Sequence, residues 1–269
     1  MRNFAEQLGY LTVAQNTDVD YLSLAYAQAS NIKAIDANNK YAVVVDSHTL
    51  KQVTNQHRKV FDYVIEIPVD LAKDEQWKQS NESQVFRLTP FKETIKLESD
   101  LLLTRDVSHL LPALRLKDVC FSYHCKDHQG NTVTTSPYRS VFLANQLPDI
   151  YTGMYYFRYT QQAADFFRLT KLLYVNWNSV KENLLHCEEH PSTDVVFALA
   201  AKLLGEENFY IPTLDCFNFV HMKSRIQGWR DLQPWVDYVN VEQQSTELRI
   251  NNLNQYYPVH YHDKRFIIS

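Results

Sequence analysis

Apolar residues in the first half of the chain gather in short continuous runs, whereas those after residue 160 recur at the spacing of a helix face. Short apolar runs rich in β-branched and aromatic side chains predict buried strands. We expect strands at Leu8–Ala14, Tyr41–Asp46, Lys59–Pro68, Thr94–Leu97, Asp118–His124 and Ile150–Tyr159. We expect helices at Asp20–Ile35, Gln161–Leu185 and Ser192–Leu204.

The order of these elements predicts the fold class. Strands that alternate with helices favour an α/β fold with a central, mostly parallel sheet, whose ligands bind at the carboxyl ends of the strands. Asp70–Glu82 is expected to form a loop with a helical turn, and Cys125–Val133 a hairpin or loop. The last forty residues are expected to be polar and irregular. We expect one domain over 1–269, with a core to about residue 230 and a C-terminal extension over 231–269.

Composition narrows the class of protein. At 269 residues, 45% apolar and 22% charged, the chain can bury a full globular core. The net charge of −4 gives no global basic field that would attract nucleic acid or membranes. The 17 tyrosines and 14 phenylalanines suit either an aromatic core or a ligand cleft.

The four cysteines show no metal-binding or redox spacing. Cys120, Cys125, Cys187 and Cys216 form no C-x-x-C pair. The first ten residues are too polar for a secretion signal, and no apolar run approaches the length of a membrane span. We therefore expect a cytoplasmic protein with free thiols and no membrane contact.

Two carboxylates stand one residue apart at the end of a predicted strand. Ile95–Leu97 is followed at once by Glu98, Ser99 and Asp100. Because side chains alternate along a strand, both carboxylates leave its end on the same side. Two such oxygen ligands suit a Mg²⁺ or Mn²⁺ ion that bridges a diphosphate. The alternative is a solvated turn into a helix, with Asp100 or Thr104 near the N-cap.

Several further segments follow one another in a recognisable order: Thr12–Asn16 with Asp20 and Tyr21, Tyr41–Asp46, Tyr63–Ile67, Leu88–Leu110, Tyr151–Phe157 and His221–Trp229. Their order resembles the glycogenin and galactosyltransferase-like family of retaining GT-A glycosyltransferases, which carry D-x-D where this chain has E-x-D. The stretches GYLTVAQNTD and FKETIKLESDLLLTRDVSH are also similar in sequence to glycosyltransferases encoded by T4-like bacteriophages.

The resemblance implies a GT-A-like nucleotide-sugar-binding fold and a set of site residues. Mn²⁺ or Mg²⁺ would be held by Glu98, Asp100 and His221. The nucleotide of a UDP-sugar would contact Thr12, Ala14, Asn16, Tyr21, Lys92 and Ser99. Asp194, where the family has a D-Q pair beside the sugar, would act near the anomeric carbon; its alternative is a helix cap.

The chain also departs from the family pattern. The lysine that clamps the diphosphate is Gln227 here, so Lys223 or Arg225 would have to supply the charge. A second family lysine aligns with Glu82, and either Lys92 or Lys96 would replace it. The alternative for Lys96 is an exposed strand residue.

Other histidine motifs carry weaker expectations. His186–His190 fits H-x-x-E-H, but Pro191 follows at once and ends any helix, so we expect a polar helix end without zinc. His260 and His262 are expected to be solvated. The chain contains no G-x-x-x-x-G-K-S/T, G-x-G-x-x-G or G-x-S-x-G, which removes the main support for P-loop, Rossmann and α/β-hydrolase proteins.

The resemblance implies metal-dependent, retaining transfer of a sugar to a hydroxyl. The phage-like wording indicates 5-hydroxymethylcytosine in DNA as acceptor and arabinose or a hexose as the sugar, with the base flipped out of the stack. Phosphate contacts are expected from Arg139, Arg158, Arg168, Lys223, Arg225, Arg230, Lys264 and Arg265. The alternatives are a glycan, protein or lipid acceptor, and a non-catalytic nucleotide-sugar-binding protein.

Overall fold

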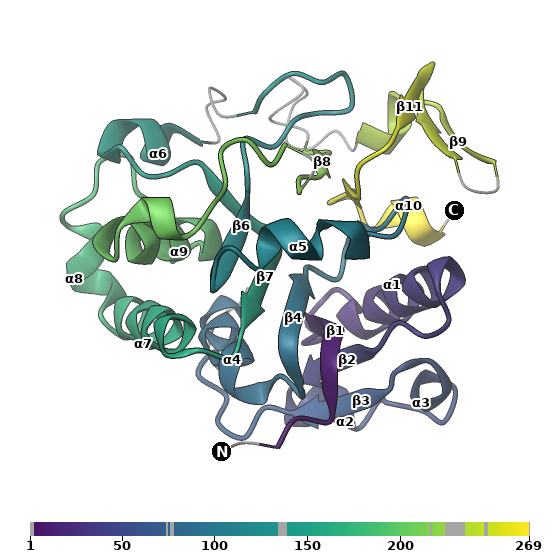
Figure 1. Ribbon diagram of the computed structural model, residues 1–269, viewed down its shortest axis with the longest axis horizontal. Helices are drawn as coiled ribbons and strands as arrows, with labels where there is room; N and C mark the ends of the chain where they lie inside the picture. The colour runs from purple at the N-terminus through teal and green to yellow at the C-terminus, as the bar shows by residue number, and fades with distance from the viewer. Residues whose placement is uncertain are drawn as a thin grey trace.

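A computed structural model describes residues 3–73, 75, 78–133, 139–215, 217–223, 235–244 and 247–268 (Figure 1). Its centre is a six-stranded sheet in the order β3 (Tyr63–Glu66), β2 (Tyr41–Val45), β1 (Glu6–Val13), β4 (Phe91–Leu97), β7 (Ile150–Arg158) and β6 (Val119–Tyr123). β1 to β4 are parallel, whereas β7 is antiparallel to both of its neighbours. The mixed α/β class with a mostly parallel sheet is confirmed.

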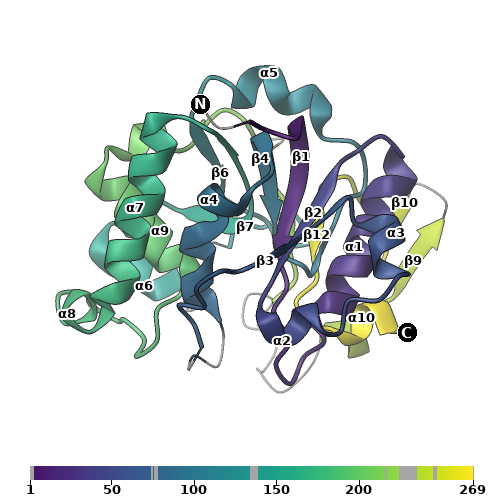
Figure 2. The same ribbon diagram turned by 90° about the horizontal axis from the view of Figure 1, so that it is seen from below.

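Helices cover both faces of this sheet (Figure 2). α1 (Tyr21–Ile35) lies on one face, and α7 (Gln161–Val175) and α9 (Thr193–Leu203) lie on the other. The side chain of Asp20 caps α1 by accepting from the Ser23 amide. The shorter helices are α2 (Ser47–Leu50), α3 (His57–Val60), α4 (Val85–Leu88), α5 (Leu111–Leu114), α6 (Ser140–Asn145), α8 (Trp177–Lys181) and α10 (Arg265–Ile268).

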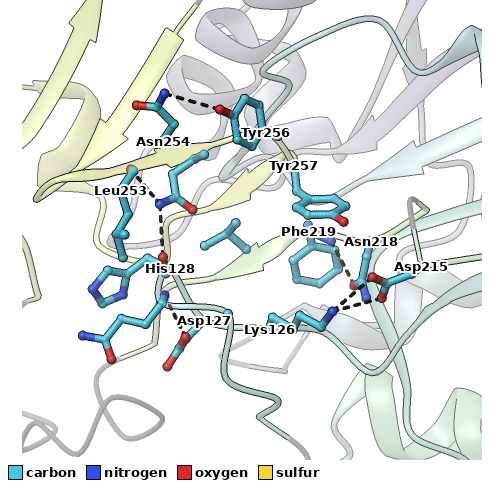
Figure 3. Close-up of a pocket in the computed structure, with 14 residues that line it drawn as sticks. Lys126, Asp127, His128, Asp215, Asn218, Phe219, Leu253, Asn254, Tyr256 and Tyr257 are labelled. Carbon is cyan, nitrogen blue, oxygen red and sulfur yellow. Dashed lines mark hydrogen bonds and ion pairs between the residues drawn. The ribbon is translucent and has the colours of Figure 1, made fainter.

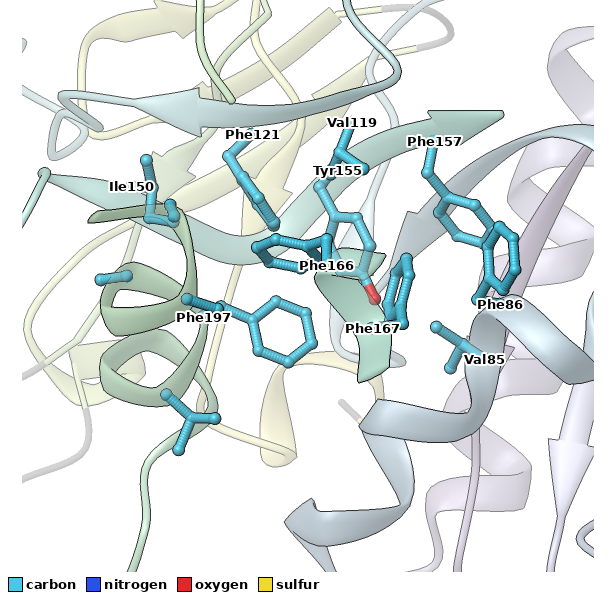
Figure 4. Packing of buried hydrophobic residues seen from close by; sticks show 14 of the residues in the cluster. Val85, Phe86, Val119, Phe121, Ile150, Tyr155, Phe157, Phe166, Phe167 and Phe197 are labelled. Carbon is cyan, nitrogen blue, oxygen red and sulfur yellow. The ribbon is translucent and has the colours of Figure 1, made fainter. Parts of the chain in front are cut away.

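Strand β7 contributes side chains to both layers of the core, because successive side chains along a strand point to opposite faces of the sheet. Tyr155 and Phe157 join the cluster under α7 and α9, whereas Met154 and Tyr156 join the cluster under α1. Many of the aromatic residues are therefore core residues, and Figure 4 shows how densely their rings pack under α7 and α9.

Phe166, on α7, lies at the centre of that aromatic cluster. Its fully buried ring lies 4.9–5.5 Å, between centroids, from the rings of Phe121, Phe167, Phe197 and Phe209. We expect Phe166→Ala to lower the free energy of unfolding by about 3–5 kcal/mol. Denaturant titration can measure this, with exposed Leu172→Ala on the same helix as control. A loss below about 1 kcal/mol for Phe166→Ala would contradict this account of the core.

The C-terminal region is more regular than its composition predicts. β12 (Val259–His260) lies between β5 (Leu101–Leu102) and β8 (Val220–His221) in a small sheet. A second small sheet is formed by β9 (Val241–Gln244), β10 (Glu247–Ile250) and β11 (Leu253–Gln255). Near the C-terminus, β12 thus pairs with β5, the strand that follows β4 in the chain.

Several boundaries differ from the predictions. The expected strand at Lys59–Pro68 divides into α3 and β3, and the expected helix Gln161–Leu185 ends at Val175, where α8 follows. In contrast, the helical turn expected within Asp70–Glu82 is present as a 3-10 helix at Gln79–Gln84. None of the helices in the described ranges has both the length and the apolar character needed to cross a lipid bilayer.

Candidate functional site

The acidic pair lies at the carboxyl end of β4, between the large sheet and the small one. The Glu98 amide donates to the carbonyl oxygen of Gly153 at 2.9 Å, and the Leu101 amide donates to the Glu98 carbonyl at 3.1 Å. The side chain of Asp100 is 7% exposed and that of Glu98 is 33% exposed. β5 follows directly, so the alternative of a solvated turn into a helix is wrong.

His260 joins the acidic pair from the other end of the chain. In the register of the small sheet it lies opposite Leu101, and its Nε2 is 2.9 Å from Glu98 Oε2 and 3.2 Å from Asp100 Oδ1. Burial disfavours the imidazolium, but the charges of Asp100 and Glu98 outweigh it and raise the pKa of His260 to about 9. The expectation that this histidine is solvated is wrong, because β12 inserts it between two strands.

His221 and His262 complete a cluster of three imidazoles around His260. One ring nitrogen from each of the three lies within 4.8 Å of the others. Burial, followed by the charge of His260, holds the pKa values of His221 and His262 well below the ordinary value. A neutral imidazole is the form that binds a metal. The structure thus brings His221 beside the acidic pair, with His260 between them.

Lys264 is the nearest cation to Asp100. Its ammonium forms an ion pair with Asp100 Oδ2 and lies 5.7 Å from the centroid of the Tyr21 ring. Burial raises the pKa of Asp100, but His260 and then Lys264 outweigh it, so the pKa is well below the usual range. Asp100 is therefore a carboxylate that already has two cationic partners.

Most of the predicted nucleotide residues lie around the end of β1, next to the acidic pair. Thr12 Oγ1 donates to the Leu97 carbonyl at 2.7 Å, and Ala14 is fully buried. Asn16 accepts from the Leu22 amide at 2.8 Å, at the start of α1 beside Tyr21. Ser99 is buried between the two carboxylates in sequence.

Lys92 does not lie with this group. It stands near the start of β4, six residues before Glu98, and strands rise about 3.3 Å per residue. Lys92 therefore lies roughly 20 Å from Glu98 along the strand, too far away to contact a nucleotide bound at the acidic pair.

Lys96 is buried, contrary to the alternative that it is an exposed strand residue. It is 1% exposed, and its ammonium lies 2.8 Å from Glu82 Oε1. Burial raises the pKa of Glu82. Burial also opposes the charged form of Glu98, but His260 and, to a smaller extent, the charge of Lys96 outweigh it and lower the pKa of Glu98. Lys96 thus lies beside Glu82, the position that aligns with the family lysine, and its replacement of that lysine stays a prediction.

Asp194 belongs to a buried network in which both of its oxygens are engaged. Oδ1 accepts from the amide and hydroxyl of Thr152 at 2.9 and 2.6 Å, and Oδ2 accepts from Arg139 at 3.0 Å. Ser192 occupies the N-cap position of α9, so Asp194 is not the capping residue. Its predicted role near the anomeric carbon stays a prediction.

Arg139 cannot contact DNA phosphates as predicted, because it is completely buried. Arg158, Arg168 and Arg265 each form an ion pair with an aspartate, and Lys264 pairs with Asp100. Arg225 and Arg230, together with Gln227, lie outside the described residues. Lys223 lies two residues after His221, and its charge helps to lower the pKa of that histidine.

The segment from His186 to His190 lies beyond the end of α8 at Lys181, so it is not the helix end that we expected. His186 has a left-handed backbone (φ 57°) beyond the end of α8, so His186 and His190 do not share a helix face. Cys120, Cys125 and Cys187 are free thiols, and Cys216 lies outside the described residues.

A cavity of about 240 Å³ has Phe219 and Val220, the two residues before His221, among its lining residues. The rest of its lining comes from Lys126–Gly130, Asp215, Asn218, β11 and the two tyrosines after β11 (Figure 3). Tyr256, Tyr257 and Phe219 bring rings to its wall, and Lys126 pairs with Asp215 at its edge. Phe219 also lies 5.5–5.7 Å, between ring centroids, from His260 and His221, so it separates the cavity from the cluster.

No protein-family model and no curated protein sequence matches this chain. Among solved structures, the galactosyltransferase LgtC is similar at a TM-score of 0.53 and 11% identity, over 95% of this chain and 87% of that one. Mouse xyloside xylosyltransferase 1 is similar at a TM-score of 0.50 and 12% identity, over 87% and 90% of the two chains.

The Streptococcus pneumoniae glycosyltransferase GlyE is also similar, at 11% identity and a TM-score of 0.49; this chain spans 45% of its length. The similarity to LgtC and to the xylosyltransferase covers 87–95% of each chain, so it concerns the fold as a whole and not one segment of it. The fold of this chain is that of the GT-A glycosyltransferases.

Proposed function

We propose that this protein transfers a sugar from a nucleotide-sugar to a hydroxyl group with the help of a divalent cation. The observation that carries the proposal is the convergence of Glu98, Asp100 and His260 at the carboxyl end of β4. Parallel α/β sheets bind their ligands at this edge. The predicted nucleoside residues Thr12 and Tyr21 lie at the same edge.

The side chains fit a divalent cation. Ligands at adjacent positions around an ion, each about 2.1 Å from it, are roughly 3 Å apart, which is close to the separations of His260 Nε2 from the two carboxylates. His260 Nδ1 and His262 Nε2 are buried and form no hydrogen bond within the described part of the chain. Mn²⁺ and Mg²⁺ are both candidates, and the imidazoles favour Mn²⁺.

The chain's own residues would divide the work as follows. Glu98, Asp100 and His260 would hold the cation, which takes the place of the proton that the two carboxylates keep on His260, and His221 lies beside them. When bound, the cation neutralises the negative charge of the departing nucleoside diphosphate. The end of β1 and the start of α1 receive the nucleoside. The resemblance of the sequence supports UDP as the nucleotide and retention at the anomeric carbon.

The acceptor has two candidate classes, each favoured by a separate observation. The phage-like wording of the sequence favours 5-hydroxymethylcytosine in DNA, with arabinose or a hexose as the sugar. The cavity beside Phe219 favours a ring-shaped acceptor, because aromatic faces stack on a sugar or an extruded base while Asp215 and Lys126 can bind its polar groups. Among its described lining residues, the charge of Lys126 is balanced by Asp127 and Asp215, so this part of the wall offers no excess of positive charge to a phosphate backbone.

We expect mass spectrometry to separate these acceptors. The enzyme is incubated with Mn²⁺, a panel of UDP-sugars including UDP-arabinose, and either hydroxymethylcytosine DNA or a panel of oligosaccharides. A gain of one sugar mass per modified base, and none on cytosine DNA, would establish the DNA acceptor. Labelling of oligosaccharides alone would exclude it. Absence of both transfer and donor hydrolysis would contradict the proposed function.

A further inference from the structure

Lys264 pairs with the candidate metal ligand Asp100 but has no part so far in the proposed metal-dependent reaction. It precedes α10 at the C-terminal end of the chain, and its ammonium reaches back to the carboxylate of Asp100. Its side chain is 26% exposed, whereas that of Asp100 is 7% exposed. A lysine that is largely removed from water and fixed on a candidate metal ligand is a specific arrangement, because buried cations need a partner.

The surroundings of Lys264 place it between the two ends of a nucleoside diphosphate. On one side is Asp100, the candidate metal ligand; on the other is the ring of Tyr21, 5.7 Å from the ammonium, at the first residue of α1. A diphosphate that joins a nucleoside near α1 to a cation on Asp100 must pass through this space. Its oxygens would then meet the ammonium.

We infer that Lys264 is the diphosphate-binding lysine of this site, and that it balances the charge of Asp100 until a divalent cation takes its place. A cation bound to Asp100 removes the partner of the ammonium. The lysine then needs another anion, which the diphosphate supplies. This inference rests on the proposed function and adds to it a residue and an order of events.

The local structure allows this change of partner. Lysine carries its charge on a flexible four-carbon stem, so the ammonium can move while the backbone stays fixed. The backbone is held by the neighbouring Arg265, whose guanidinium pairs with Asp237 and Asp263, and by the Phe266 amide, which donates to the Asp263 carbonyl at 3.1 Å. Only the side chain of Lys264 has to turn.

Competition between the cation and Lys264 for Asp100 should couple the binding of the cation to that of the diphosphate. Because the cation must displace Lys264 from Asp100, the cation alone should bind weakly, and the diphosphate should strengthen its binding by giving the ammonium a new partner. Linkage requires that the cation strengthen diphosphate binding by the same factor. A diphosphate that contacts the cation couples the two ligands by itself, so the contribution of Lys264 is the part of this factor that is lost in Lys264→Ala.

Calorimetric titration of Lys264→Ala tests the inference. With Mn²⁺ alone, we expect the variant to bind the ion more tightly than the wild type, because no lysine competes for Asp100. With UDP at saturating Mn²⁺, we expect affinity to fall by about 10- to 100-fold, the effect of losing a hydrogen bond to a charged group. Affinity for uridine should not change, and Lys264→Arg should restore part of the UDP affinity.

The control is Arg168→Ala, which removes an exposed cation that pairs with Asp165 on α7 and leaves Asp100, Lys264 and their partners in place. It should bind Mn²⁺ and UDP as the wild type does. Unchanged UDP affinity in Lys264→Ala, or weaker Mn²⁺ binding in that variant, would overturn the inference. Failure of the wild type itself to bind UDP with Mn²⁺ would instead contradict the proposed function, and the Mn²⁺ titration without nucleotide would still decide whether Lys264 competes for Asp100.

Discussion

Replacing Asp100 with asparagine is expected to lower kcat/KM for sugar transfer by about 10³-fold or more, because the charge stabilisation that a metal ion supplies amounts to several kcal/mol. Asparagine keeps the size of the side chain but removes the negative charge that attracts the cation. It also releases Lys264 and His260 from their shared anion. Steady-state rates with Mn²⁺ and a UDP-sugar measure the effect.

The control for this prediction is Asp165→Asn, which removes a carboxylate that pairs with Arg168 on the surface of α7. That variant should keep its activity, since the lost ion pair is exposed. An Asp100→Asn enzyme with more than a tenth of the wild-type rate, or a wild-type enzyme fully active in EDTA, would contradict the role given to the acidic pair.

Arg139→Met is expected to lower the stability of the fold strongly. The guanidinium lies between the rings of Phe142 and Tyr151, 3.4 and 3.9 Å from their centroids, and donates to Asp149 and Asp194. Removing one member of a buried ion pair costs about 3–5 kcal/mol, because the remaining charges stay buried without compensation. Denaturant titration should show a loss of this size.

Arg158→Met gives a matched comparison, because Arg158 pairs with Asp118 but is 39% exposed. Its loss should lower the free energy of unfolding by no more than about 1 kcal/mol. Equal losses in the two variants would contradict the structural role of Arg139.

Asp194→Asn then separates the two roles open to that residue. If Asp194 only anchors Arg139 and Thr152, the variant should lose stability while the enzyme that remains folded keeps its rate. If it also acts near the anomeric carbon, kcat should fall in protein that is still folded. Rates measured well below the unfolding temperature, together with the unfolding curve, distinguish the two outcomes.

The elements of the first half of the fold could be predicted because their signals are local. A continuous run such as Tyr41–Val45 is buried on both faces of a parallel sheet, and the residues of α1 repeat at the spacing of one helix face. Glu98 and Asp100 follow directly after such a run. Their place at the edge of the sheet therefore needed no information from distant parts of the chain.

The partners of the acidic pair could not be found in the same way. His260 and Lys264 lie more than 150 residues from Asp100 in sequence, inside a polar segment that predicts exposure. The available signal was the alternation of Val259 and Tyr261, both fully buried, with His260 and His262. Such alternation is typical of a strand with one apolar face, and it would have placed both histidines on the other face.

Lys96 shows a second limit. A lysine in a strand is normally exposed, and the burial of this one depends on Glu82, which approaches from the segment before α4. An ion pair between residues that are not neighbours in sequence, such as Lys96 and Glu82, can be recognised only in the structure.

The most direct test of the metal site is a titration of Mn²⁺ followed by electron paramagnetic resonance, in which the signal of the free ion decreases as it binds. In the presence of UDP, we predict that the wild-type protein binds one Mn²⁺, and that Asp100→Asn and His260→Ala lose most of this affinity while Asp165→Asn keeps it. A wild-type protein that leaves the signal of free Mn²⁺ unchanged, or three variants that all bind it as the wild type does, would contradict the assignment of Glu98, Asp100 and His260 as its ligands.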